Sequence, residues 1–198
     1  MNRRPKIAIV DYGVGNIYSA LKAFRRFVPG TCVTEEADEI AEADALVLPG
    51  VGAFEIGMRG LRLRGLIPAV KDFYASGRPM LGICLGAQLM LEKSYEFGEH
   101  DGLGLIKGKV VPFSGLAPGA KIPHMGWNEI YSSRNASWDG TILSALPGHG
   151  EVYFVHSFIL KPADMDAVIA VAEHGGQEFC AVVQKGNVSG CQFHPEKS

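Results

Sequence analysis

Short apolar runs alternate with helical patterns through the first half of this chain, and this alternation limits the folds open to it. Strand-like runs span residues 6–11, 31–34, 45–48 and 80–83, and apolar residues recur at helical spacing over residues 16–27, 66–75 and 85–91. A strand that is apolar along its whole length is buried on both faces. The alternation therefore predicts an α/β fold in which a central, mostly parallel sheet is flanked by helices.

The second half of the chain has a different pattern, in which strands are separated by turns rich in glycine and proline. The clearest strand-like runs from about residue 104 onward are residues 110–113, 152–155, 168–171 and 181–184. Residues 185–187 (KGN) are typical of a hairpin turn between the last two strands. Because no linker or repeat divides the sequence, we expect one domain over residues 1–198, with an antiparallel β portion added in the C-terminal half.

The composition is that of an ordinary globular protein, with 47% hydrophobic and 20% charged residues. No basic stripe accompanies the net charge of -2, so we expect no nucleic-acid partner. No run approaches the roughly 20 apolar residues of a membrane-spanning helix, and we expect no membrane association. The four cysteines form no CxxC pair and the six histidines show no metal-ligand spacing, which favours a cytoplasmic protein with reduced thiols and no metal.

Residues 82–86 (GICLG) join a predicted strand to a predicted helix, which is the context of a nucleophile elbow. Glycines two positions before and after Cys84 allow the tight turn and let the backbone approach closely. The backbone amide of Leu85 could then serve as one donor to an oxyanion. The alternative is that Cys84 is a small buried hydrophobic residue, which is the more common role of a cysteine near a strand end.

His194 and Glu196 lie two residues apart near the end of the sequence. Side chains at this spacing in an extended segment project to the same side, so Glu196 could orient the His194 imidazole. A cysteine nucleophile needs such a base, both to take its proton and to protonate the leaving group. The alternative is a surface histidine beside a solvated glutamate.

Residues 48–54 (LPGVGAF) directly follow a predicted strand, where ligand sites of parallel sheets gather. This loop is therefore expected beside Cys84, where its backbone could direct an amide at an oxyanion; the alternative is a plain turn. Residues 13–18 begin like the glycine-rich loop of a dinucleotide site but lack its third glycine. We expect no dinucleotide cofactor.

Six segments of the chain, in this order, resemble one known family. They are residues 11–16 (DYGVGN), 48–54 (LPGVGAF), 82–88 (GICLGAQ), 123–128 (PHMGWN), 153–157 (YFVHS) and 194–198 (HPEKS). The elbow and the HPE segment are similar to the class I, or triad, glutamine amidotransferases. The full set is similar to the glutaminase subunits of imidazole glycerol phosphate synthase, and it spans nearly the whole chain.

The resemblance implies roles for individual residues. The triad would be Cys84 as nucleophile, His194 as base and Glu196 as its orienting partner. Gln88 would bind the substrate glutamine. The oxyanion strand would be formed by Gly50, Val51 and Gly52, together with the amide of Leu85. A subunit interface would lie near Asn16, Tyr153 and Lys197. No cofactor is implied.

The resemblance also implies an activity and a partner. L-glutamine would be hydrolysed through a glutamyl thioester, and the ammonia would pass to a TIM-barrel cyclase subunit in a heterodimer. That subunit uses ammonia to convert a phosphoribulosyl-formimino ribotide into imidazole glycerol phosphate and aminoimidazole carboxamide ribotide. In this family the glutaminase is nearly silent until the partner binds its own substrate.

Two alternatives stay open. One is the glutaminase of another amidotransferase, against which the PHMGWN segment and the Lys197-Ser198 ending argue. The other is a flavodoxin-like cysteine hydrolase, which would lack the late His194–Glu196 pair. Family members usually continue beyond the position of Ser198, so we expect that a further C-terminal segment exists.

Overall fold

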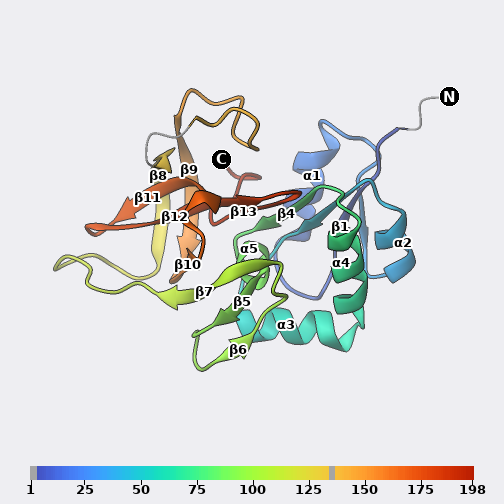
Figure 1. Cartoon of the computed structure of the whole chain (residues 1–198), viewed down its shortest axis with the longest axis horizontal. Coiled ribbons are helices and arrows are strands. Elements are labelled where there is room, and N and C mark those ends of the chain that lie inside the picture. The colour runs from blue at the N-terminus through green and yellow to red at the C-terminus, as the bar shows by residue number, and fades with distance from the viewer. Residues whose placement is uncertain (1–3, 134–136) are drawn as a thin grey trace.

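The computed structural model describes residues 4–133 and 137–198, and five of their strands form a parallel half of the sheet. These strands are β1 (Ile7–Val10), β2 (Cys32–Thr34), β3 (Ala45–Leu48), β4 (Met80–Ile83) and β13 (Val188–Cys191). They lie in the order β2-β1-β3-β4-β13, and each neighbouring pair is parallel. Figure 1 labels β1, β4 and β13 of this half. The predicted parallel sheet is confirmed for this half.

The remaining strands extend the same sheet. They are β5 (Leu91–Ser94), β6 (His100–Asp101), β7 (Ile106–Pro112), β8 (His124–Ser132), β9 (His149–His156), β10 (Phe158–Pro162), β11 (Val168–His174) and β12 (Gln177–Lys185). The path continues from β13 through β12-β10-β7-β5-β6, while β11, β8 and β9 branch from β12. All of these pairs are antiparallel except β5 with β7, so the expected antiparallel portion is present.

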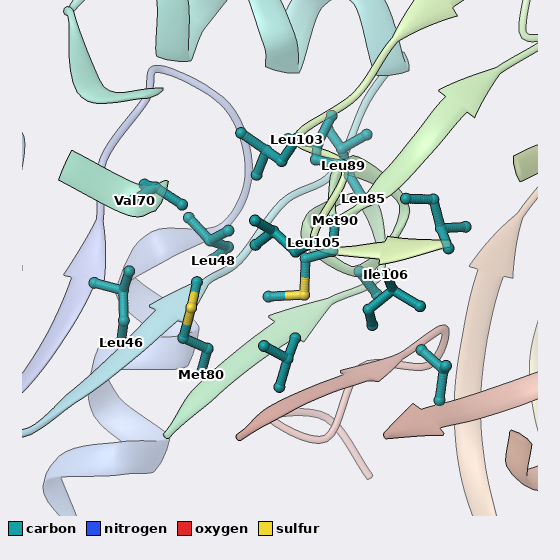
Figure 2. Packing of buried hydrophobic residues seen from close by; sticks show 14 of the residues in the cluster. Leu46, Leu48, Val70, Met80, Leu85, Leu89, Met90, Leu103, Leu105 and Ile106 are labelled. Carbon is teal, nitrogen blue, oxygen red and sulfur yellow. The ribbon is translucent and has the colours of Figure 1, made fainter. Parts of the chain in front are cut away.

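Helices cover both faces of the parallel half. They are α1 (Ile17–Arg25), α2 (Ala37–Glu42), α3 (Phe54–Leu63), α4 (Leu66–Ala75) and α5 (Leu85–Leu89), and a short 3-10 helix, η2 (Met165–Ala167), precedes β11. Successive side chains of a strand point to opposite faces. Leu46 and Leu48 of β3 therefore join one core with α2 to α5, whereas Val47 joins a second core with α1. Figure 2 shows part of the first core, with Leu48 beside Val70 of α4.

Several expectations about the elements need correction. Helices α2 and α3 were not expected, and the helix after the elbow ends at Leu89 because Leu91 already belongs to β5. The first helix ends at Arg25, and Phe27, expected on its apolar face, is 85% exposed. The hairpin over residues 185–187 is confirmed, since Lys185 pairs with Val188 and Gly186 has a φ of +57°.

The topology brings three loops to one edge of the sheet. Strands β3, β4 and β13 are parallel neighbours, so their carboxyl ends meet at the same edge. The loops that begin there carry residues 49–52, Cys84 and residues 192–196. Open parallel sheets hold their ligand sites at this edge. Within the two described ranges, no helix is long and apolar enough to cross a membrane.

Candidate active site

Cys84 sits on a sharp turn between β4 and α5. Its φ of 51° and ψ of -107° lie outside the common regions for a residue with a side chain. The turn depends on close backbone contacts, because a Cβ at Gly86 would lie 1.7 Å from the carbonyl oxygen of Leu48. The predicted elbow is therefore present, and it holds the Cys84 side chain beyond the end of the strand.

His194 and Glu196 form a buried pair just after β13. Nδ1 of His194 lies 2.9 Å from Oε1 of Glu196, and the two side chains are only 2% and 5% exposed. The carboxylate accepts the Nδ1 proton, which leaves Nε2 as the nitrogen available for chemistry. Nε2 makes no hydrogen bond within the described residues. The loop is fixed by its backbone, since the N–H of His194 donates to the Tyr153 carbonyl at 2.9 Å.

The charge state of His194 is set by competing effects. Burial lowers its pKa, but interactions with Cys84 and Glu196 outweigh burial and raise the pKa from 6.5 to about 9. An imidazolium is thus favoured near neutral pH when Cys84 is a thiolate. This arrangement suits a cysteine nucleophile paired with a general acid.

A cavity of about 190 Å³ opens at the Cys84 side chain. It is lined by Val51, Gly52, Cys84, Leu85, Gln88, Glu96, Pro123, Val155, His156, Ser157 and Phe158. A larger groove of about 520 Å³ lies beside Lys93, Lys109 and Lys161. That groove has no cysteine or histidine in its lining, so the smaller cavity is the better candidate for covalent chemistry.

The predicted oxyanion groups lie together, and one of them, the amide of Leu85, is already hydrogen-bonded in this conformation. The backbone N–H of Leu85 donates to the carbonyl oxygen of Gly50 at 3.3 Å. The buried hydroxyl of Tyr12 donates to the carbonyl of Pro49, and a Cβ on Gly50 would collide with that hydroxyl. The carbonyl of Gly50 therefore accepts the hydrogen bond that the amide of Leu85 would otherwise donate to an oxyanion.

Two side-chain amides, those of Gln88 in the cavity lining and of Gln192 behind it, lie next to Cys84. Nε2 of Gln88 donates to the carbonyl of Phe158 and to Oε1 of Gln192, both at 3.2 Å. Nε2 of Gln192 in turn lies 3.8 Å from Sγ of Cys84. Gln192 is 0% exposed, so its hydrogen bonds replace those that water cannot supply, whereas Gln88, 5% exposed, lines the cavity.

Comparison with known proteins identifies the family. The sequence profile described as "Glutamine amidotransferase class-I" matches residues 8–198. The chain belongs to the class I glutamine amidotransferases. A protein of Legionella pneumophila (strain Lens), described as "Imidazole glycerol phosphate synthase subunit HisH 1", is 50% identical over 97% of this chain and 92% of its own length. The HisH subunit of Lactococcus lactis is 46% identical over 98% of this chain and 92% of its own length.

Solved structures agree on the fold. A putative GMP synthase protein of Thermoplasma acidophilum superposes with a TM-score of 0.68 over 99% of this chain and 86% of its own, at 20% identity. A further glutamine amidotransferase superposes with a TM-score of 0.71 over 96% of this chain and 90% of its own, at 17% identity. At these identities the likeness concerns the class I amidotransferase fold, not the substrate.

The residues expected near an interface are only partly brought together in this amidotransferase. Lys197 lies over the ring of Tyr153, 5.6 Å from its centre, and Tyr153 is edge-on to Trp127 at 6.2 Å. Trp127 is 59% exposed. Asn16 instead caps helix α1, where its side chain accepts from the N–H of Ser19 at 3.3 Å.

Sequence reasoning missed two side chains of the amidotransferase site. Glu96 lines the cavity and accepts from the Phe54 N–H at 2.5 Å, and burial raises its pKa although that hydrogen bond lowers it. Nothing in its local sequence indicates this place. Gln192 precedes His194 by two residues, so the extended spacing that linked His194 to Glu196 could also have drawn attention to it. Among the described residues, no group of histidine, cysteine and carboxylate side chains is arranged to hold a metal ion.

Proposed function

We propose that this protein is the glutaminase subunit of an imidazole glycerol phosphate synthase, which releases ammonia from L-glutamine for histidine biosynthesis. The observation that carries the proposal is the 50% identity to a HisH subunit over 97% of this chain and 92% of that protein. The placement of Cys84 beside a buried His194–Glu196 pair supports it. Residues 1–198 would form one catalytic domain, acting in the cytoplasm.

The proposed reaction begins with attack of the Cys84 thiolate on the side-chain amide carbon of glutamine. The protonated His194, whose pKa is about 9, gives its proton to the departing ammonia, and a glutamyl thioester remains. The neutral His194 then takes a proton from water as that water attacks the thioester. Glutamate leaves, and the thiolate and imidazolium are restored.

Substrate would be held by the polar side chains of the cavity. Both N–H groups of the Gln88 amide are engaged, by Phe158 and Gln192, so its carbonyl oxygen is left to accept from a ligand. Glu96 adds a carboxylate to the cavity lining. An acceptor and a carboxylate together suit the α-ammonium group of glutamine.

The oxyanion strand would have to change before the enzyme works. The amide of Leu85 can serve an oxyanion only when the carbonyl of Gly50 turns away from it. Val51 and Gly52 follow Gly50 in the chain and line the cavity, so their backbone amides would turn together with the Gly50 carbonyl. The closed arrangement supports a glutaminase that stays idle until its partner acts on this strand.

The proposed partner is a TIM-barrel cyclase subunit in a heterodimer. One contiguous cluster joins the half-buried Tyr153 to the exposed Lys197 and Trp127, which supports a docking role. Asn16 is a further proposed contact. Aromatic residues are enriched in the centres of protein interfaces.

The test is a stimulation assay with the assembled complex. The protein is purified with a cyclase subunit, and glutamate release is measured with and without the ribotide substrate of the cyclase. We expect slow release by the free chain and at least a hundredfold stimulation in the loaded complex, the size of a typical strong coupling. Full activity of the isolated chain, or no binding to the cyclase, would point to another amidotransferase.

A further inference from the structure

Gln192 is a buried glutamine that joins two groups of the proposed site. It is 0% exposed and follows β13, and its backbone N–H donates to the carbonyl of Ala181 at 2.9 Å. Its side chain lies between the Gln88 amide, at 3.2 Å, and Sγ of Cys84, at 3.8 Å. Burying an amide is unfavourable unless both of its ends are hydrogen-bonded, so the identity of each end matters.

The direction of this amide chain follows from one backbone carbonyl. The Phe158 carbonyl can only accept, so the Gln88 atom that contacts it is the nitrogen. The same nitrogen faces Gln192, and it can only donate, so the Gln192 atom that it faces is the oxygen. The remaining end of the Gln192 amide, which faces Sγ of Cys84, is therefore an N–H donor.

The surroundings of the Cys84 sulfur give this donor a specific effect. Besides Gln192, the carbonyl of Val155 lies 3.9 Å from Sγ, where it accepts a hydrogen bond from the S–H group and so favours the thiol. The ionisable groups that interact with Cys84 include His194, whose positive charge favours the thiolate, and the buried, uncharged Tyr12. A thiolate can only accept: the charged imidazolium of His194 interacts with it, and the N–H of Gln192, 3.8 Å from Sγ, is an additional, uncharged donor. Gln192 therefore favours the reactive form, against the effect of Val155.

We propose that Gln192 stabilises the Cys84 thiolate through its N–H and, through its carbonyl, holds Gln88 in the orientation that binds substrate. This inference rests on the proposed glutaminase function. It makes Gln192 the link between the nucleophile and the substrate-binding amide. Loss of Gln192 should thus impair thiol reactivity and glutamine binding by separable routes.

Two variants of similar volume separate these routes. Gln192→Glu keeps an acceptor for Gln88 but places an oxygen against Sγ, whereas Gln192→Met removes both hydrogen bonds. The readout is the rate of iodoacetamide alkylation of Cys84 across pH 5 to 10, followed by mass spectrometry of the peptide that contains it. Burial raises the pKa of Cys180 to about 12, and the buried Cys191 is likewise shifted upward, so neither competes.

We expect the midpoint of the alkylation profile to rise by about one pH unit in Gln192→Glu, with roughly tenfold slower reaction near pH 7. In Gln192→Met the midpoint should rise less, and KM for glutamine should increase about fivefold because Gln88 loses its partner. Gln184→Met is the matched control. That glutamine accepts from the N–H of Ile142, away from the cavity, and its loss should leave both readouts unchanged.

A purely structural role predicts a different result. If both Gln192 variants melt at a lower temperature but keep the wild-type alkylation midpoint and KM, the proposal is overturned. If Gln192→Glu does not fold, Gln192→Met still decides, because it buries no charge and leaves only one N–H of Gln88 without its partner. Failure of the glutaminase assignment is distinct: the wild-type complex would then lack glutamine-dependent synthesis, whatever the alkylation profiles show.

Discussion

Two neighbouring strands of the sheet, β4 and β13, each lead into a cysteine, and the two thiols differ sharply. Cys191 pairs with Ile83, and its carbonyl accepts from the N–H of Cys84 at 2.8 Å. Cys191 stays in regular strand geometry, and its thiol donates to the carbonyl of Gly82 at 3.6 Å. Burial, with smaller contributions from nearby negative groups, raises its pKa well above the usual value.

Exposure does not separate the two cysteines, which are 5% and 1% exposed. What separates them is the left-handed turn at Cys84, which carries its sulfur out of the strand to the cavity, Gln192 and the neighbourhood of His194. A buried thiol thus becomes a candidate nucleophile through backbone geometry and polar neighbours.

The largest expected effect comes from replacing each of the two cysteines in turn. Cys84→Ser should lower glutamine-dependent turnover by at least about 10⁴-fold, because a hydroxyl is a far weaker nucleophile here. Cys191→Ala should keep turnover within about threefold of wild type and reduce stability by about 1 kcal/mol, the loss expected for a small buried group. The measurement is glutamate release by the loaded complex, with ammonia-dependent synthesis as the control for assembly. Equal losses in both variants would remove the distinction.

The next effect tests the turn that separates the two cysteines. Gly86→Ala would place a Cβ 1.7 Å from the Leu48 carbonyl, so we expect a loss of about 3 kcal/mol in the free energy of unfolding. Gly150→Ala is the control, because its Cβ would meet only one side-chain atom, at 3.6 Å. Urea unfolding followed by circular dichroism measures both. A Gly86→Ala protein as stable as the control would show that the elbow does not need its glycine.

Close packing of this kind also explains which elements could be predicted from sequence. The runs that became β3, β4 and α4 were placed correctly because their apolar pattern carries the signal by itself. Helix α3 was missed because Gly57 and Gly60 weaken its helical pattern. Those glycines are needed for packing, since a Cβ on Gly60 would lie 2.1 Å from the carbonyl of Tyr12.

The residues of the candidate site likewise fall into those that a local sequence motif marks and those that it does not. Cys84, His194 and Glu196 stand in local motifs, and the resemblance of those motifs to a known family is what predicts them as a group. Glu96 and Gln192 take their places from contacts with segments far along the chain, from residues 42 and 108 positions away. No local pattern encodes such contacts.

A smaller effect is expected at the proposed base, His194, through its partner Glu196. Glu196→Gln removes the carboxylate that holds Nδ1 of His194 at 2.9 Å. We expect kcat to fall about 100-fold with little change in KM, the range found when general acid–base function is impaired. Glu151→Gln, at an exposed position of β9, is the control. An unchanged kcat would mean that the pair does not serve the thiol.

The smallest expected effect is a pH dependence of the free energy of unfolding, caused by the interaction of His194 with Cys84. The pKa of His194 is raised from 6.5 to about 9 in the folded protein. A raised pKa means that the folded state holds the proton more tightly, so this stabilisation is complete below pH 6.5 and is lost as pH rises toward 9. Cys84→Ser removes the thiolate, and the titration midpoint of His194 followed by NMR should fall. An unchanged midpoint would mean that the thiolate does not interact with His194.

Two other histidines provide the internal reference for that titration. Burial lowers the pKa of His124 to about 4 and that of His156 to about 3. Groups with lowered pKa values are bound to fewer protons in the folded state, so they reduce stability only as pH falls below 6.5. Cys84→Ser should therefore flatten the stability profile between pH 6.5 and 9 and leave the acid side unchanged. Urea unfolding at several pH values checks this, and a change confined to the acid side would assign the effect to His124 and His156 instead.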